Sequence, residues 1–79
     1  MIRFRLAEQI EKKQFQLGRR LTVIEVAEGS GINRITLSKI LNQRGYNTGT
    51  ENLDRLCRYF CCRVEDLVEY VVDDESAEP

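Results

Sequence analysis

Two short amphipathic segments, separated by one glycine within residues 21–42, constrain the fold more than any other feature of this sequence. The first opens with Thr22 three residues before Glu25, the spacing at which the two residues can cap a helix reciprocally. The apolar positions that follow recur at helical spacing: Val23, Val26 and Ala27. Gly31 then provides the positive φ of a tight turn. The segment therefore predicts a short helix that ends at a sharp bend.

The second segment predicts another short helix with two different faces. Ile32 is a single apolar anchor, and Asn33 has a side chain that can cap the helix that follows. The inward face consists of Leu37, Ile40 and Leu41. The outward face is polar and basic and consists of Arg34, Ile35, Ser38 and Lys39, with Asn42 at its end. Two short helices joined by a glycine turn form a helix-turn-helix, whose second helix fits the DNA major groove.

The same residues carry a family resemblance that extends over roughly residues 4–70. The residues concerned are Leu21, Thr22, Glu25, Val26, Ala27, Gly31, Ile32, Asn33, Arg34, Thr36, Leu37, Ser38, Lys39, Ile40 and Asn42. In this combination they resemble the Cro/CI-type (XRE, lambda-repressor-like) helix-turn-helix family. A downstream set resembles its small YozG-like subgroup: Leu53, Asp54, Arg55, Leu56, Cys57, Cys62, Asp66, Leu67, Val68, Glu69 and Tyr70. The resemblance implies a compact, all-α, five-helix DNA-binding domain that acts as a transcriptional regulator, with repression as the expected mode.

One position departs from the family pattern. Family members commonly carry glutamine directly after the position of Thr22, where it helps to hold a phosphate, but this sequence has Val23. Backbone N–H groups at the start of the helix can still bind a phosphate. We therefore expect affinity to depend more on Asn42, Arg44 and the loop that follows.

The remaining pattern predicts one domain over residues 1–72 and an acidic, flexible tail over residues 73–79. A first helix begins at Leu6 and ends near residues 14–16, with Leu6, Ala7 and Ile10 on one side, and with Phe15 and Leu17 covering the edge of the core. Residues 2–5 alternate, as do Val68, Tyr70 and Val72, so short terminal strands can pair within the chain or with a partner.

A later helix is expected to begin near Gly49, because Thr48 and Glu51 repeat the capping spacing. Its buried stripe is Leu53, Leu56, Cys57 and Phe60. Cys61 stands where the family often has glycine, so we expect either a strained left-handed residue or a differently built helix end. Val64, Leu67 and Val68 suit a short last helix.

Charge is distributed unevenly along the chain. The net charge is −1, yet residues 1–50 contain nine Lys/Arg and four Asp/Glu, whereas residues 51–79 contain three Lys/Arg and nine Asp/Glu. This asymmetry predicts a basic face over the helix-turn-helix and an acidic end away from it. In the simpler alternative, both sets of charges only solvate helix surfaces.

These patterns give two sets of candidate DNA contacts. The residues expected to reach base edges are Asn33, Arg34, Ile35, Ser38 and Lys39. Arg34 can donate two hydrogen bonds to guanine, and Ile35 can pack on a thymine methyl group. The residues expected near the DNA backbone are Thr22, Val23, Thr36, Asn42, Arg44, Tyr46, Asn47 and Thr48. The alternative for the loop is a solvated segment whose Tyr46 packs on the domain.

Catalysis and metal binding are not expected. The chain has no histidine, and Ser30 and Ser38 lack a base that could activate them. Three clustered cysteines, Cys57, Cys61 and Cys62, are an odd number and too few for a usual zinc site, so we interpret Cys57 and Cys62 as packing residues, with metal or redox sensing as the alternative. No cofactor or small-molecule effector is evident.

Double-stranded DNA is the expected partner. One domain covers about half an operator, so a homodimer is expected, at least on DNA. No apolar run approaches the length of a membrane span, and Arg3, Arg5 and Glu8 interrupt any secretion signal, so we expect a cytoplasmic location. The rival hypothesis is a protein-interaction module on the same fold, such as an antitoxin or anti-regulator, which the near-neutral net charge and Val23 favour.

Overall fold

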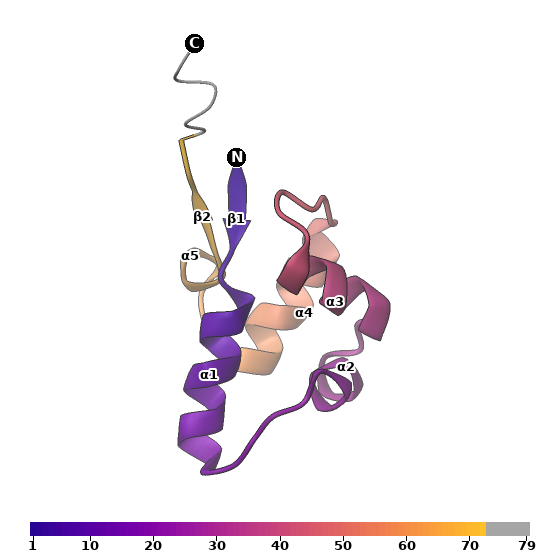
Figure 1. The fold of residues 1–79 in the computed structure, drawn as a ribbon, viewed down its shortest axis with the longest axis vertical. Helices are drawn as coiled ribbons and strands as arrows, with labels where there is room; N and C mark the ends of the chain where they lie inside the picture. The colour runs from indigo at the N-terminus through magenta and orange to yellow at the C-terminus, as the bar shows by residue number, and fades with distance from the viewer. Residues whose placement is uncertain (73–79) are drawn as a thin grey trace.

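The computed structural model describes residues 1–72, in which five helices follow one strand and precede another (Figure 1). The elements are β1 Ile2–Phe4, α1 Leu6–Leu17, α2 Val23–Ser30, α3 Arg34–Asn42, α4 Thr50–Phe60, α5 Val64–Leu67 and β2 Val68–Tyr70. The predicted five-helix fold and the short terminal strands are therefore confirmed. The acidic tail predicted for residues 73–79 lies outside the described residues.

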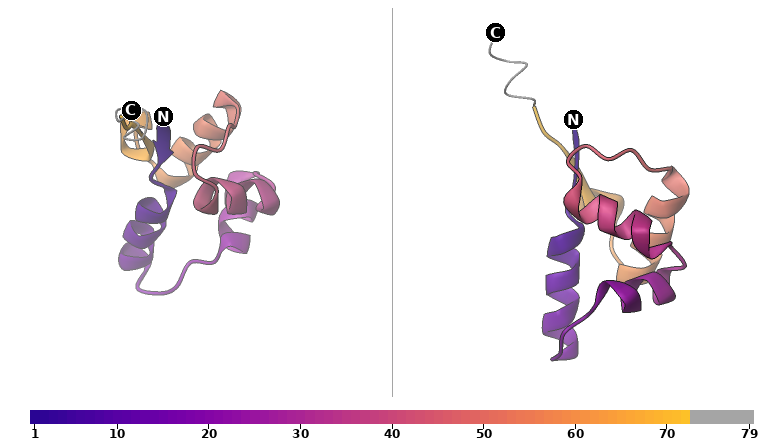
Figure 2. Two further views of the ribbon diagram at one scale, coloured as in Figure 1. Left: turned by 45° about the horizontal axis from the view of Figure 1, so that its top comes forward. Right: turned by 45° about the vertical axis from the view of Figure 1, so that its right-hand side comes forward.

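The core is built from one or two aliphatic residues of each of the five helices and two from the segments before α2 and α3. Its fully buried members are Leu6, Leu21, Val26, Ile32, Leu37, Ile40, Leu56 and Leu67. Each such side chain stabilises the fold by roughly 1.5–3 kcal/mol relative to an exposed position. The apolar faces predicted for α2, α3 and α4 all contribute to this cluster. Helix α2 packs against both α3 and α4, which can be followed in the ribbon views of Figure 2. The outward face of α3 is thereby held on a rigid support.

The prediction for α1 is only partly right. Leu6 is buried, but Ala7 is exposed and Gln9 is the second buried residue of the helix, only 7% accessible. Gln9 is accommodated because its Nε2 donates a hydrogen bond to the Asp66 carbonyl, 3.1 Å away. The expectation that Phe15 and Leu17 cover the core is wrong, since they are 88% and 45% exposed. Phe15 lies nine positions after Leu6, which is the opposite side of the helix.

A close approach between α2 and α4 fixes the support of the helix-turn-helix. A Cβ atom added to Gly29 would collide with the ring of Tyr59, so only glycine lets this ring lie across α2. The same ring meets Phe60 edge-on at 4.9 Å between centroids, and Lys13 Nζ lies 4.8 Å from its centre. Tyr59 was not in the buried stripe that the sequence predicts.

The two ends of α4 depart from simple expectation in different ways. The Thr48–Glu51 capping pair is not formed, because the N-cap is Gly49, one residue later. Thr48 Oγ1 instead accepts a hydrogen bond from Asn52 Nδ2 at 2.8 Å. At the other end Cys61 is left-handed with φ 54°, and its N–H donates to Cys57 O. Of the two expectations for Cys61, the left-handed residue is the one observed.

The terminal strands pair with each other inside the chain. They are antiparallel, with Ile2 opposite Tyr70, Arg3 opposite Glu69 and Phe4 opposite Val68. Arg3 and Glu69 form an ion pair across the two strands. The short α5 buries Leu67 but leaves Val64 half exposed, and Val68 belongs to the strand rather than to the last helix. Within residues 1–72, no helix is long and apolar enough to cross a membrane.

Candidate nucleic-acid interface

The turn before α3 is defined by three local contacts. Gly31 is left-handed with φ 79° and closes α2, and Thr22 and Glu25 form the predicted capping box at its start. The Gly31 carbonyl accepts a hydrogen bond from Arg55 Nη1 of α4, 3.4 Å away. No local spacing in the sequence predicts this contact, because Arg55 and Gly31 are 24 residues apart. The turn between α2 and α3 is therefore tied to α4.

Asn33 caps α3 as the sequence predicts. Its Oδ1 accepts hydrogen bonds from the N–H groups of Ile35, at 2.7 Å, and Thr36, at 3.4 Å. The carboxamide oxygen is thus occupied, and the NH₂ group is the part of Asn33 that can donate to a base edge. Thr36, expected near the DNA backbone, is half-buried beside this cap.

The outward face of α3 brings four predicted base-contacting residues together. Arg34, Ile35, Ser38 and Lys39 are all exposed, on the side of α3 opposite to buried Leu37 and Ile40. Ile35 is 63% exposed although it is a large aliphatic residue. Exposing this apolar side chain to water is unfavourable, and contact with an apolar group of a partner would remove that free-energy penalty. The face thus offers two cations, one hydroxyl and one apolar side chain.

The two cations of this face, Arg34 and Lys39, have no carboxylate partner among the described residues, unlike most arginines of the chain. Among the described residues, neither Arg34 nor Lys39 forms an ion pair, and α3 itself contains no acidic residue. In contrast, ion pairs hold Arg3, Arg5, Arg19, Arg55, Arg58 and Arg63. The positive charge of α3 is therefore available to an external anion.

The end of α3 and the start of α2 present polar backbone and amide groups. Asn42 Nδ2 donates to the Ser38 carbonyl at 2.9 Å and to Ser38 Oγ at 3.4 Å, so an external acceptor would replace the longer of these two bonds. At the start of α2, the side chain of Val23 packs against the core, so only its N–H can reach a phosphate. The Thr22 hydroxyl is engaged in the capping box.

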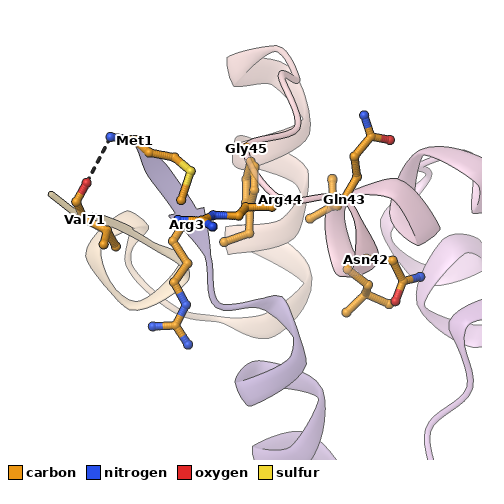
Figure 3. Close-up of a pocket in the computed structure, with 10 residues that line it drawn as sticks. Met1, Arg3, Asn42, Gln43, Arg44, Gly45 and Val71 are labelled. Carbon is orange, nitrogen blue, oxygen red and sulfur yellow. Dashed lines mark hydrogen bonds between the residues drawn. The ribbon is translucent and has the colours of Figure 1, made fainter. Parts of the chain in front are cut away.

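The loop after α3 combines packed and exposed residues. Tyr46 packs against the core, as the alternative for this loop expects, and Thr48 Oγ1 accepts from Asn52. Arg44 and Asn47 are exposed. Figure 3 shows Asn42, Gln43 and Arg44 across from Met1 and Arg3, around a pocket of about 420 Å³. The pocket separates this loop from β1.

The cysteines lie away from this face, on α4 and just after it. Cys57 and Cys62 are half-buried and pack against the core, whereas Cys61 is exposed. Burial, with the neighbouring Cys57 thiol, raises the pKa of the Cys62 thiol to about 11. No group of three metal-ligating side chains occurs in residues 1–72. Packing is the role that this geometry supports for Cys57 and Cys62.

The geometry agrees with a comparison to known proteins. Residues 14–73 match the family model described as the Cro/C1-type HTH DNA-binding domain. No curated protein and no solved structure matches the chain. The family match begins in α1 and includes α2, the turn at Gly31 and the whole of α3. Because it covers more than half of the sequence, the protein belongs to the Cro/C1-type helix-turn-helix DNA-binding domains.

Proposed function

We propose that the protein is a sequence-specific regulator of transcription, acting as a repressor, that inserts α3 into the major groove of double-stranded DNA. The observation that supports this most directly is the outward face of α3. Its two cations, Arg34 and Lys39, have no carboxylate partner among the described residues. DNA supplies the missing anions and, in its major groove, the base edges that such side chains read.

Each residue of this face has a distinct proposed role. Arg34, in the first turn of α3, donates two hydrogen bonds to a guanine, and Lys39 donates to a base or a phosphate. Ile35 contacts a thymine methyl group, which accounts for its exposure. Ser38 and the NH₂ group of Asn33 complete the base contacts. Good bidentate contacts discriminate between bases by roughly 1–3 kcal/mol.

The proposed backbone contacts surround α3 on both sides. At the start of α2, the Val23 N–H holds one phosphate, whereas the Thr22 N–H is bonded to Glu25 Oε1 and only lies beside it. Beyond the end of α3, the contacts come from Asn42, Arg44, Asn47 and the hydroxyl groups of Tyr46 and Thr48, with Thr36 between the two sides. Their function is to fix the register of α3 on the duplex.

A homodimer that binds two half-sites completes the proposal. One α3 reads about half an operator, and two half-sites usually lie about one helical turn apart. Repression then follows when the bound dimer covers a promoter. Assignment to the YozG-like subgroup and a cytoplasmic location stay predictions.

Selection of bound sequences from a random DNA library, followed by titration, tests the proposal. We expect one enriched motif and an affinity that falls by about 0.9 log units per log unit of salt for each phosphate contact. Arg34→Ala should weaken binding about 10–100-fold and relax the preference at one base pair. Arg58→Ala on α4 is the matched control and should leave binding unchanged. An affinity independent of salt, or equal losses for both variants, would contradict the proposal.

The alternative is a protein-interaction module, such as an antitoxin or anti-regulator. It is favoured by Phe15, an aromatic side chain that is 88% exposed on α1. Phe15→Ser distinguishes the two, because it removes this anchor and leaves α3 intact. Retained DNA binding by Phe15→Ser and loss by Arg34→Glu support the regulator; the absence of any enriched DNA motif supports the alternative.

A further inference from the structure

The described fold ends close to the end of α3. Val71, the residue after β2, donates a hydrogen bond to Met1 O at 2.8 Å and accepts one from the Met1 amino group at 3.0 Å. Met1 in turn lies close to the loop after α3, because a Cβ atom added to Gly45 would be 3.6 Å from its Sδ. Figure 3 shows Met1 between Val71 and Gly45, and Arg44 lines the same pocket. Residues 73–79 therefore start beside the loop that joins α3 to α4.

The acidic tail, residues 73–79, carries the charge opposite to that of the fold it follows. Of the 13 Asp/Glu of the chain, four lie in the tail, which leaves nine in residues 1–72 beside all 12 Lys/Arg, a net charge of +3. The four acids of the tail are Asp73, Asp74, Glu75 and Glu78, and it contains no base. Apart from Ala77 and Pro79 it has no apolar side chain, so electrostatic attraction is the interaction that can hold it on a surface.

The basic surface next to the start of the acidic tail is the end of α3. Arg3, on the strand that pairs with β2, is already bound to Glu69 and Glu8. Lys39, in the last turn of α3, has no carboxylate partner within residues 1–72. Arg44 is exposed on the adjoining loop. Lys39 and Arg44 thus give this end of α3 a positive charge close to the point where the acidic tail starts.

The acidic tail is long enough to cover this surface. An extended chain spans about 3.3–3.6 Å per residue, so seven residues reach up to about 25 Å. The whole of α3, with nine residues, is about 14 Å long. A segment tethered beside its binding surface has an effective concentration in the millimolar range, so even weak, exposed ion pairs can hold it there at low salt.

We propose that residues 73–79 bind back onto the basic end of α3, at Lys39 and Arg44, and compete there with the phosphates of DNA. DNA then has to displace the acidic tail before it contacts these two cations, whereas Arg34, at the other end of α3, stays exposed. The effect on DNA binding rests on the proposed function, but the contact itself does not.

Cross-linking of the full chain with a water-soluble carbodiimide, in the absence of DNA, tests the contact. The reagent activates a carboxylate, a lysine Nζ attacks it to form an amide, and the reagent takes up the lost water as a urea. The chain has three lysines, and Lys12 and Lys13 are internal controls because α1 extends from β1 away from the paired strands (Figure 1). We expect Lys39 to be joined to residues 73–79 at least about fivefold more often than either control at about 50 mM salt, and this excess to disappear at about 1 M salt.

A variant and a mixture of labelled chains assign the cross-linked product. Lys39→Arg keeps the charge but removes the amine, so the product should be lost. When isotope-labelled and unlabelled chains are mixed, each product should carry a single label, because the contact lies within one chain. Mixed labels would show a contact between two copies and would overturn the inference, as would equal yields at Lys39 and Lys12.

Neutralising the acidic tail tests the competition with DNA. The variant that combines Asp73→Asn, Asp74→Asn, Glu75→Gln and Glu78→Gln should bind DNA about three- to tenfold more tightly at about 50 mM salt, and within about twofold of the wild type at about 0.5 M. The gain should be equal for the selected motif and for a random duplex, because the tail competes for charge and not for bases. Glu11→Gln, which removes one exposed acid of α1, is the control and should leave the affinity within about twofold.

The two experiments separate the possible failures. A gain in DNA affinity without the cross-link at Lys39 would mean that the acids only repel DNA from a distance, which overturns the contact. The cross-link without a gain in affinity overturns the competition. A cross-link in a chain that binds no DNA sequence contradicts the proposed function and leaves the contact supported.

Discussion

The outward faces of α3 and α4 each carry two cations, but only those of α4 are paired with carboxylates of the same helix. On α4, Arg55 lies 3.0 Å from Glu51, and Arg58 is paired with Asp54 at 2.6 Å, each acid standing four residues before its base. On α3, the residue four positions before Lys39 is Ile35 rather than an acid. Arg34 is the first residue of its helix and follows the uncharged Asn33. One helix neutralises its own charge, and the other leaves it to an external partner.

This difference explains how a chain with a net charge of −1 can present a basic surface. Pairs at i and i+4 stabilise a helix by only about 0.2–0.5 kcal/mol, so their value to folding is small. Their effect on the electrostatic surface is clearer, because they cancel the positive charge of α4 while the two cations of α3 keep theirs. The α4 ion pairs therefore affect the distribution of surface charge more than the stability of the fold.

The largest expected effect comes from giving α3 the charge pattern of α4. Ile35→Glu places an acid four residues before Lys39, and it removes the proposed contact with a thymine methyl group. We expect affinity for the selected DNA to fall about 100-fold, the upper part of the range for losing a specific base contact. Melting temperature should change little, because Ile35 is 63% exposed.

Asp54→Asn is the converse change and the control. It releases Arg58 from its partner on α4, and we expect DNA affinity to remain within about twofold because the proposed DNA contacts do not include α4. Replacing the thymine opposite Ile35 with deoxyuridine should weaken wild-type binding but not Ile35→Glu binding. Equal affinity of the wild type and Ile35→Glu would show that this face does not contact DNA.

The fold was predictable from the sequence wherever a residue type has one strongly preferred local role, such as capping a helix or adopting a left-handed conformation. The Thr22–Glu25 cap, the left-handed Gly31 and the Asn33 cap are local, so the sequence predicts them without knowledge of the rest of the chain. Apart from the Thr48–Glu51 cap, which is replaced by a Gly49 N-cap, the predictions that failed concern tertiary contacts. Whether Gln9 or Ala7 is buried depends on the Asp66 carbonyl, 57 residues away, and no local pattern reports it.

The candidate interface was predictable to a similar depth. Helical periodicity separates Arg34, Ile35, Ser38 and Lys39 from the buried face, and the structure exposes all four. Periodicity says nothing of what already occupies a side chain. The packing of Tyr46 against the core and the bond between Thr48 and Asn52 become visible only when the loop is folded.

A smaller effect, on stability, is expected from substitutions at the C-terminal ends of α2 and α4, since each helix is followed by a left-handed residue. Cys61→Gly should stabilise the protein by up to about 1–2 kcal/mol, because a side chain is costly at φ 54°. Gly31→Ala should destabilise it by about the same amount, for the same reason at φ 79°, since an added Cβ meets no atom within 4 Å. Urea unfolding measures both, and a destabilised Cys61→Gly variant would show that the thiol stabilises this end.

Substitutions at the starts of α2 and α4 should change the free energy of unfolding by smaller amounts. Thr22→Ala removes the cap of α2 and should cost about 1 kcal/mol. Thr48→Ala leaves the Gly49 cap of α4 and removes only the bond with Asn52, for which we expect about 0.5 kcal/mol. Thermal unfolding in the same buffer gives both values. A larger loss for Thr48→Ala would mean that the loop, not the cap, limits the stability of α4.

The smallest effect is a pH dependence confined to the start of α2. The hydrogen bond from the Thr22 N–H, followed by the nearby Arg19 guanidinium, lowers the pKa of Glu25 below its ordinary 4.5. A carboxyl group whose pKa is lower in the folded state stabilises the fold above its unfolded pKa and loses this contribution as pH falls through the folded value. We therefore expect stability to fall on acidification below about pH 4.5, and to fall less in Glu25→Gln.

NMR titration of Arg19→Gln should show a Glu25 pKa higher than in the wild type but still below 4.5, since the bond from Thr22 remains. If Glu25 titrates at 4.5 in the folded wild type, the capping box is not closed in solution, and the stability difference expected between Thr22→Ala and Thr48→Ala should disappear with it.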